Sequence, residues 1–329
     1  MDDAVRLLSQ RDIAMLMSPA DYLAAVEMGF RAANEGRASS PAPLHLAAPG
    51  GGFHAKAALI ENGRGAYAVL KLNGNFPANA GRPTVQGLIM VSDARTGAPL
   101  TIMDSIEVTL RRTAAASALA ARYLARRESA SVTFCGCGAQ AWAHVEAFGD
   151  LFSLREGAAW DVDPGKAAAF AFRARQAFGI DMRAAETLKE ATSDADIVIT
   201  STTSSTAFLA HGDVQPGAFI AAVGADAPHK NEIAPELMAH ANVYVDVLAQ
   251  CLVMGDLHHA IAAGAMTREN VRGDLAALVS GHCPRREHAG EITLFDSTGA
   301  AIEDAASAAL IFERALDRGV GNEVKFAGL

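Results

Sequence analysis

The stretch S-V-T-F-C-G-C-G-A-Q-A, residues 131–141, decides the fold that we expect for this chain. Its first five residues form an apolar run typical of a buried strand, and Gly136-x-Gly138-x-x-Ala141 follows directly. The first Gly permits a tight turn, the second lets backbone approach a pyrophosphate, and a small third residue lets helix and strand pack closely. The helix that begins here would offer free N–H groups to the anion. We therefore predict a Rossmann-type dinucleotide-binding domain opening near Ser131.

An acidic residue at the end of the next apolar run strengthens this prediction. Asp161, in A-A-W-D-V-D, lies 25 positions after Gly136, near the spacing of about 20 expected for a ribose-binding carboxylate. Such a carboxylate would accept hydrogen bonds from both adenosine ribose hydroxyls and would repel a 2′-phosphate, which favours NAD over NADP. In the alternative interpretation, Gly136 and Gly138 only turn a strand and Asp161 caps the next helix.

The chain after Arg127 alternates between strand-like and helix-like segments, which is typical of a parallel, doubly wound sheet. The predicted strands are Ser131–Cys135, Ala158–Val162, Met182–Glu186, Asp196–Thr200, Ala218–Val223 and Asn242–Val247. The predicted helices between them are Gln140–Phe152, Pro164–Phe178 and Leu188–Ser193.

The chain before Arg127 has a different pattern, which predicts an α+β domain. A helix is expected over Ser18–Glu35, because Ser18 is a good N-cap and Pro19 occupies the favoured first helical position. The Pro-, Ser- and Gly-rich stretch Ser39–Gly52 is expected to be loop. Antiparallel strands are predicted at Phe53–Leu59, Ala66–Leu72, Val85–Ser92 and Pro99–Met103, with a turn at Asp93–Gly97 and a helix at Thr109–Arg126. A further amphipathic helix is predicted near the C-terminus, at Ala301–Asp317.

Bulk composition restricts the class of function. The 329 residues indicate two domains, and 50% hydrophobic with 20% charged residues is ordinary for a globular protein. The net charge of -9 and the lack of a basic run exclude nucleic acid as an expected partner. We predict neither a signal peptide nor a membrane partner, since the N-terminus is acidic and no apolar run approaches about 18 residues. Four cysteines without metal-ligand spacing predict no metal site and favour a cytoplasmic protein.

Five stretches together resemble the ornithine cyclodeaminase/mu-crystallin family. They are V-L-K-L-N-G-N-F-P-A-N (69–79), T-L-R-R-T-A-A-A-S-A-L-A-A-R-Y-L-A (109–125), G-C-G-A-Q (136–140), A-V-G-A-D-A-P-H-K-N-E (222–232) and F-D-S-T-G-A-A-I-E-D (295–304). The resemblance implies a homodimer. It also implies a discontinuous substrate-binding and dimerisation domain, 1–112 with 300–329, around a Rossmann domain at 113–299.

The resemblance also implies roles for individual residues. Lys71 and Arg112 would hold the substrate carboxylate near the nicotinamide, Lys71 as a point charge and Arg112 as a planar fork of donors. Lys71 and Asp226 would be the residues that donate or accept protons. Thr298 would line the substrate pocket. Expected cofactor contacts are Thr84, Thr113, Gly136, Gly138, Ala139, Gln140, Asp161, Thr202, Val223, Lys230 and Ser297.

Each of the three principal residues also has a structural interpretation. Lys71 could snorkel from a strand to solvent, and Asp226 could be a turn residue before Pro228. Arg112 could lie on a helix surface, although its neighbour Arg111 suits that position better.

Three positions depart from the family's cyclodeaminases. His45 is the nearest match to an Arg of the family, and F-H-A-K-A-A gives His54 and Lys56 where a Glu and a Met are expected. A distal substrate ammonium would want a carboxylate partner, and a pocket with His54 and Lys56 would repel it. On a strand these two residues share one face, which could point into the pocket or to water.

The sequence therefore favours NAD(P)H-dependent reduction of a cyclic ketimine carboxylate. The substrate would be 1-pyrroline-2-carboxylate or 1-piperideine-2-carboxylate, and the product proline or pipecolate, with a proton from Lys71 or from Asp226 through water. Three alternatives stay open: an ornithine cyclodeaminase-type ammonia lyase that recycles NAD⁺, an alanine-type amino-acid dehydrogenase, and a non-catalytic nucleotide- and ligand-binding protein.

Overall fold

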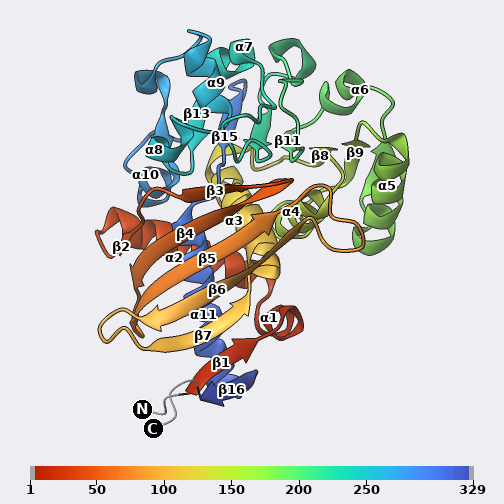
Figure 1. Cartoon of the computed structure of the whole chain (residues 1–329). Coiled ribbons are helices and arrows are strands. Elements are labelled where there is room, and N and C mark those ends of the chain that lie inside the picture. The colour runs from red at the N-terminus through yellow and green to blue at the C-terminus, as the bar shows by residue number, and fades with distance from the viewer. Residues whose placement is uncertain (1–3, 326–329) are drawn as a thin grey trace. The chain divides into compact units, whose positions relative to one another are not determined.

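A computed structural model describes residues 4–325, and the chain divides into two compact units (Figure 1). Unit 1 comprises Met1–Arg112 and Ala301–Leu329, and unit 2 comprises Thr113–Ala300. Ala300, expected in the discontinuous domain, thus falls in unit 2. The preceding Gly299 donates its N–H to Asp246 of that unit, at 2.6 Å, and this bond fixes the chain there.

Unit 1 is built on a mostly antiparallel sheet in the order β16-β1-β7-β6-β5-β4-β2, with β3 paired to β4. Only the β1–β7 pair is parallel among the described strand pairs of this sheet. The strands are β1 (Ala4–Leu8), β2 (Ala38–Ser39), β3 (Leu44–Ala48), β4 (Gly51–Glu61), β5 (Ala66–Asn75), β6 (Val85–Asp93), β7 (Pro99–Asp104) and β16 (Asn322–Lys325).

The helices of unit 1 begin where capping residues predict. Ser9 caps α1 (Gln10–Leu16), and Ser18 caps α2 (Pro19–Asn34) with the expected Pro19 at its first position. Helix α11 (Ala301–Arg318) packs on β4, β5 and α2, and its first turn carries Glu303 and Asp304. The boundary between the units falls within α3 (Ile106–Leu124).

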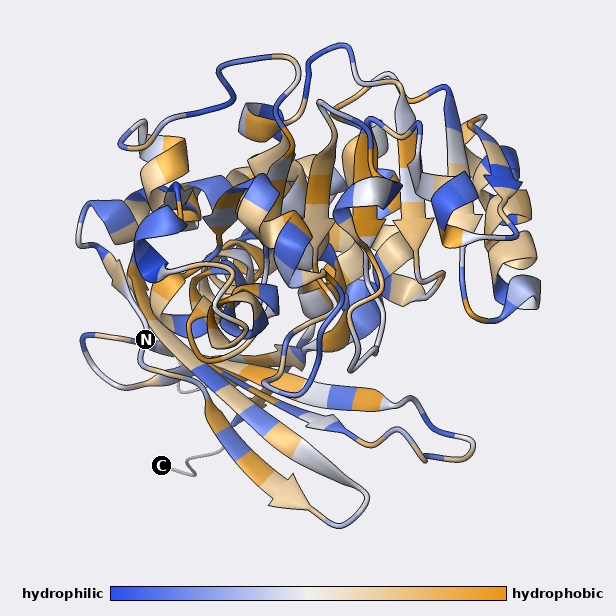
Figure 2. Ribbon diagram, turned by 90° about the horizontal axis from the view of Figure 1, so that it is seen from above, coloured by the Kyte–Doolittle hydropathy of each residue, from blue (hydrophilic) through white to orange (hydrophobic). Residues whose placement is uncertain are grey.

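The two faces of the unit 1 sheet differ sharply. Tyr67, Val69 and Lys71 of β5 are buried, whereas Leu70 and Leu72, which point to the other face, are 42% and 44% exposed. Figure 2 shows that the strands carry both polar and apolar residues along their length. One face therefore packs under α11, and the other presents an apolar surface that the described residues leave uncovered.

Unit 2 is a parallel sheet in the order β10-β9-β8-β11-β12-β15-β13-β14. Its strands are β8 (Ser131–Cys135), β9 (Glu156–Trp160), β10 (Asp181–Ala184), β11 (Ile197–Thr200), β12 (Phe219–Ala222), β13 (Asn242–Val245), β14 (Gly273–Asp274) and β15 (Thr293–Asp296). Its helices after α3 are α4 (Ala139–Gly149), α5 (Pro164–Phe178), α6 (Leu188–Thr192), α7 (Pro235–His240), α8 (Leu248–Cys251), α9 (Asp256–Ala262) and α10 (Leu275–Ser280), with short 3-10 turns at His211–Asp213 and Arg268–Asn270.

Strand order in unit 2 reverses between β8 and β11. The chain proceeds outward from β8 through β9 to β10, then returns to β11 on the other side of β8. Ligands of doubly wound sheets bind beyond the carboxyl ends of the strands at such a switch point. The predicted doubly wound α/β architecture is therefore confirmed, and its ligand-binding end is defined.

One prediction of local structure is wrong, and several short elements were not predicted. Ser39–Gly52 is not all loop, because Leu44–Ala48 forms β3 and pairs with β4 across a turn at Pro49–Gly50. The Pro and Gly residues that indicated a loop flank this strand instead of interrupting it. Strand β15 was missed because T-L-F-D is only four residues long and is stabilised by pairing with β12 and β13. No helix among residues 4–325 combines the length and hydropathy needed to cross a bilayer.

Candidate active site

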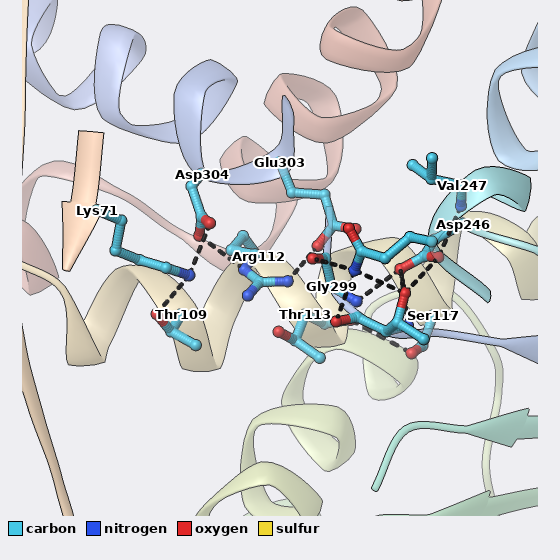
Figure 3. A network of polar contacts seen from close by, with 12 residues as sticks. Lys71, Thr109, Arg112, Thr113, Ser117, Asp246, Val247, Gly299, Glu303 and Asp304 are labelled. Atoms are coloured by element: carbon cyan, nitrogen blue, oxygen red, sulfur yellow. Dashed lines mark hydrogen bonds and ion pairs between the residues drawn. The ribbon is translucent and has the colours of Figure 1, made fainter. Parts of the chain in front are cut away.

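Lys71 lies on the buried face of β5 and is only 3% exposed. Its Nζ lies 2.6 Å from Asp304 Oδ2 and donates to Thr109 Oγ1 at 3.4 Å (Figure 3). The strand alternation that buries Tyr67 and Val69 brings Lys71 under α11. The structure therefore excludes the interpretation that Lys71 snorkels to solvent.

Arg112 lies beside Lys71 in the same buried cluster. Its Nε donates to Asp304 Oδ1 at 2.9 Å and its Nη1 to Glu303 Oε2 at 2.6 Å. Its neighbour Arg111 is more exposed and donates to Glu107 on the same helix at 2.9 Å. Arg112 is therefore the buried member of the pair, while Arg111 holds the peripheral position predicted for it.

Lys71, Arg112, Glu303 and Asp304 form a cluster of two cations and two carboxylates, which we call the charge cluster. Glu303 and Asp304 were not predicted from the sequence. Both carboxylates lie in the first turn of α11, where the helix dipole favours negative charge. The two cations assigned to a substrate carboxylate thus already face carboxylates of the chain itself.

Burial and neighbouring charges adjust the proton affinities in the charge cluster. Burial lowers the pKa of Lys71 to about 7, with Asp304 opposing this effect and Arg112 and Lys56 adding to it. Burial alone would raise the pKa of Asp304, but Arg112 and Lys71 hold it below its usual value. Lys71 can therefore gain and lose a proton near neutral pH while Asp304 stays ionised.

His45, His54 and Lys56 lie on the same face of the sheet as Lys71. Lys56 of β4 is directly opposite Lys71, and His54 is opposite both His45 and Asn73. The two imidazole rings lie 4.4 Å apart, and both His54 and Lys56 are half-buried. Residues directly opposite each other on neighbouring strands share a face of the sheet. His54 and Lys56 therefore lie on the face that carries Lys71.

The predicted nucleotide turn in unit 2 follows β8 directly. Gly136 has φ +92°, and a Cβ there would lie 2.9 Å from Ser201 O and from Thr202 Cγ2. Gly138 caps α4 without a side-chain hydrogen bond, and a Cβ there would meet only open space. The turn thus brings the loop after β8 close to the loop after β11, at the switch point.

Asp161 closes this turn from the end of β9. Its Oδ2 accepts from Cys137 N at 2.9 Å, and its Oδ1 accepts from Asp163 N at 2.9 Å. In the alternative interpretation Asp161 caps the next helix, but the residue that caps α5 is Asp163.

The other predicted cofactor residues occupy several elements. Ala139 and Gln140 open α4. Val223 and Ser297 directly follow β12 and β15, and Thr202 lies two residues after the end of β11. Gln140 Oε1 and Ser297 Oγ are buried without a hydrogen-bond partner among the described residues. Thr113 is buried in α3, and Thr84 is exposed in the segment before β6.

Asp226 and Lys230 form an ion pair with each other on the loop after β12. Lys230 Nζ lies 2.5 Å from Asp226 Oδ1, and the Asp226 side chain is 56% exposed. This loop leaves the carboxyl end of the sheet, which is the position expected for a ligand-facing residue.

A group of buried carboxylates ties the loops of unit 2 together, and sequence reasoning missed it. Glu232 accepts from Thr200 Oγ1 and from the backbone N–H groups of Thr202 and Gly224, at 2.6–2.8 Å. Asp246 accepts from Thr298 Oγ1, which also receives a hydrogen bond from Gln250. Thr298, expected to line a substrate pocket, is 1% exposed and makes both of these contacts within unit 2.

Comparison with known proteins places these observations in a family. The model of the ornithine cyclodeaminase/mu-crystallin family matches residues 3–319. The chain belongs to this family.

Relatives within the family are named for different activities. An archaeal alanine dehydrogenase, solved as a dimer with bound NAD, has a TM-score of 0.94 and 34% identity over 98% of this chain and 100% of that one. A Δ¹-pyrroline-2-carboxylate reductase from Thermococcus litoralis, solved with NADH and L-proline, has a TM-score of 0.93 and 31% identity over 97% and 100%. Iminosuccinate reductase from Paracoccus denitrificans is 31% identical over 97% of this chain and 99% of its own length.

Proposed function

We propose that this protein is an NAD(P)H-dependent oxidoreductase that reduces a cyclic ketimine carboxylate, such as 1-pyrroline-2-carboxylate or 1-piperideine-2-carboxylate, to the cyclic amino acid. The observation that carries the proposal is that the buried Lys71 and Arg112 face the same carboxylate, that of Asp304, at 2.6 Å and 2.9 Å. Burial lowers the pKa of this lysine to about 7. An imine must be protonated to accept hydride well, and a general acid is most effective when its pKa lies near the working pH.

The nucleotide turn supports NAD as the cofactor. The exposed Gly138 and the start of α4, which no side chain caps, fit a pyrophosphate. The Asp161 carboxylate fits an adenosine ribose. The buried, unpartnered Gln140 Oε1 and Ser297 Oγ are also available to a bound group. When bound, the reduced cofactor supplies the hydride, and the chain supplies placement, charge and the proton.

The residues around Lys71 support an anionic substrate. Lys56 and His54 extend positive charge and hydrogen-bonding capacity along the face that carries Lys71. A carboxylate on the substrate would be attracted there, and Arg112 adds a planar fork. A distal ammonium would be repelled by Lys56, which makes ornithine cyclodeamination the weaker alternative.

A substrate panel tests the proposed function. Purified protein would be offered both cyclic imines with NADH or NADPH, and separately ornithine with NAD⁺. We expect loss of nicotinamide absorbance with formation of proline or pipecolate, faster with NADH. Ammonia release from ornithine without net change in absorbance would instead establish the cyclodeaminase cycle, and no turnover of either cyclic imine would contradict the proposed imine reduction.

An amino-acid dehydrogenase is the second candidate, favoured by the similarity to the archaeal alanine dehydrogenase. This reaction needs free ammonia in the reductive direction, whereas reduction of a preformed cyclic imine does not. Pyruvate with and without ammonium therefore separates the two, because only a dehydrogenase would oxidise NADH in the first mixture and not in the second.

The proposal includes a homodimer formed through the apolar face of the unit 1 sheet. Its exposed residues are Leu44, Leu46, Phe53, Leu59, Leu70, Leu72, Leu88 and Met90, which are 37–57% exposed. Apolar patches of this kind on a soluble protein mark interaction sites, and the similar alanine dehydrogenase was solved as a dimer.

A charge introduced into this face tests the dimer. Leu88→Glu should convert a dimer to a monomer in analytical ultracentrifugation, because burying an unpaired carboxylate is costly. Met15→Glu is the matched control, since Met15 on α1 is exposed to the same 57% as Leu88 but lies outside the apolar face. A wild-type monomer, or a dimer that survives Leu88→Glu, would contradict this part of the proposal.

A further inference from the structure

Asp304 occupies the centre of the charge cluster. Its Oδ2 faces Lys71 Nζ at 2.6 Å and its Oδ1 accepts from Arg112 Nε at 2.9 Å, with its side chain 2% exposed. Glu303, the other carboxylate of the cluster, faces Arg112 through Nη1. The carboxylate 2.6 Å from Lys71 is therefore that of Asp304.

A buried ammonium group depends on such a partner. Removal from water disfavours the charged form of a lysine, and an opposite charge within about 4–6 Å restores it. Here burial, Arg112 and Lys56 all work against the Lys71 charge, and Asp304 is the group that favours it. Asp304 is in turn fixed by Arg112 and by its place in the first turn of α11.

We propose that Asp304 is a positioning residue that holds Lys71 in place as the charged proton donor for imine reduction. This inference rests on the proposed function. In this role Asp304 contacts neither the imine nor the nicotinamide, and it acts through the Lys71 ammonium that it faces.

The proton balance of the step follows from these contacts. An N–H bond of the Lys71 ammonium breaks, its proton bonds to the imine nitrogen, and hydride adds to the imine carbon. The imine is reduced to the amine, the nicotinamide is oxidised, and Lys71 is left as a neutral amine. Asp304 remains a carboxylate opposite Arg112 throughout, and a proton from solvent restores the ammonium.

The pH dependence of kcat/KM should follow the protonation of Lys71, which depends on the charged groups around it. The charged and polar groups around Lys71 are Thr109 and Arg112 from α3, Glu303 and Asp304 from α11, and Lys56 from β4. Reduction requires charged Lys71, so kcat/KM should fall as pH rises above about 7 in the wild type. Protonation of the imine itself affects every variant equally, so a difference between variants belongs to the protein.

The first experiment compares the pH profile of kcat/KM for imine reduction in the wild type and in Asp304→Asn. The variant should show its basic limb displaced to lower pH by about 1–3 units, because it loses one opposite charge beside a buried lysine. Its activity should therefore approach that of the wild type as the pH is lowered. Asp317→Asn is the control on the same helix, where Asp317 pairs with the exposed Arg64, and its profile should match the wild type.

A charge-balanced double variant covers the case in which Asp304→Asn does not fold. Removing one partner from a buried ion pair leaves an uncompensated charge and is strongly destabilising, but Lys71→Met with Asp304→Asn leaves the Arg112–Glu303 pair balanced. If Asp304 acts through Lys71, the double variant should retain the same kcat as Lys71→Met within about twofold. Binding of NADH, measured by fluorescence, confirms that each variant is folded.

Two results would overturn the role of Asp304. One is a basic limb in Asp304→Asn that coincides with the wild type. The other is a further loss of tenfold or more when Asp304→Asn is added to Lys71→Met, since Asp304 would then act independently of Lys71. A wild type that reduces no imine at all would contradict the proposed function instead, so the two failures are distinguishable.

Discussion

Buried carboxylates occur in both units, but their proton affinities shift in opposite directions. Asp304 in unit 1 faces Lys71 and Arg112, and these cations hold its pKa below its usual value. Asp296 in unit 2 is equally buried but accepts from the backbone N–H groups of Asp256 and Leu257, and burial raises its pKa to about 7. The same residue type at the same depth is therefore ionised in one unit and close to protonation in the other.

The difference indicates two uses of a buried carboxylate. In unit 1 Asp304 faces Lys71, and we propose that it keeps this lysine charged for proton transfer. In unit 2 they accept hydrogen bonds from loops at the carboxyl ends of the strands, as Glu232 does from Thr200, Thr202 and Gly224. We expect substitutions in the first group to alter chemistry and those in the second to alter stability and cofactor binding.

The largest effect should come from Lys71→Met. Loss of a general acid typically costs about 10²–10⁴-fold in rate, and we expect kcat for imine reduction to fall in this range. The Kd for NADH should change little, because the nucleotide turn belongs to unit 2. Stopped-flow reduction kinetics and fluorescence titration measure the two quantities. Retention of wild-type kcat would contradict the assignment of Lys71.

A smaller effect is expected from Glu232→Gln. An amide cannot accept all the hydrogen bonds that the carboxylate accepts, and its NH₂ group would face donors. The free energy of unfolding should fall by about 1–3 kcal/mol, as expected for buried donors left unsatisfied. Urea denaturation provides the measurement. If Glu232→Gln instead shifted the basic limb of the pH profile of kcat/KM and left the free energy of unfolding unchanged, the distinction between catalytic and structural carboxylates would be wrong.

An effect of similar size, seen only as the pH is lowered, concerns His144, a buried residue of α4 near the nucleotide turn. Its Nδ1 lies 2.7 Å from Gln140 O, and burial lowers its pKa to about 4. Because the unfolded chain binds this proton more readily, stability is full above about pH 6.5 and declines as the pH falls toward 4. Between pH 7 and 5 the loss should be about 2 kcal/mol.

His144→Gln supplies the control for this prediction, because it removes the titrating group. Urea denaturation of both proteins at pH 7 and pH 5 isolates the contribution of His144 from that of the buried carboxylates. An identical pH dependence in the two proteins would show that His144 is not held neutral in the folded state.

Local patterns in the sequence predicted much of the fold. The strand at Ser131–Cys135 and the helix at Pro164–Phe178 match the structure residue for residue, because apolar runs, glycine turns and caps act over a few neighbouring positions. Strand β3 and strand β15 escaped prediction because pairing with distant strands stabilises them.

The candidate site could be predicted only in part. Lys71 and Arg112 were found through the family resemblance, but Asp304 looked like an ordinary acidic residue in the first turn of a helix. Its partners lie 233 and 192 positions away in the chain, and only tertiary packing brings these residues together. Similarly, the two-residue spacing of His54 and Lys56 predicts that they share a face of β4. Only the pairing of β4 with β5, which places Lys56 opposite Lys71, shows that this is the face that carries Lys71.

One measurement tests the central claim most directly: the fate of the hydride when the protein turns over 1-pyrroline-2-carboxylate with NADH deuterated at the transferable position. We predict one NADH consumed for each proline formed, with deuterium on its α-carbon and no ammonia released. Proline without deuterium, or ammonia produced without net consumption of NADH, would contradict the assignment of this protein as an imine reductase.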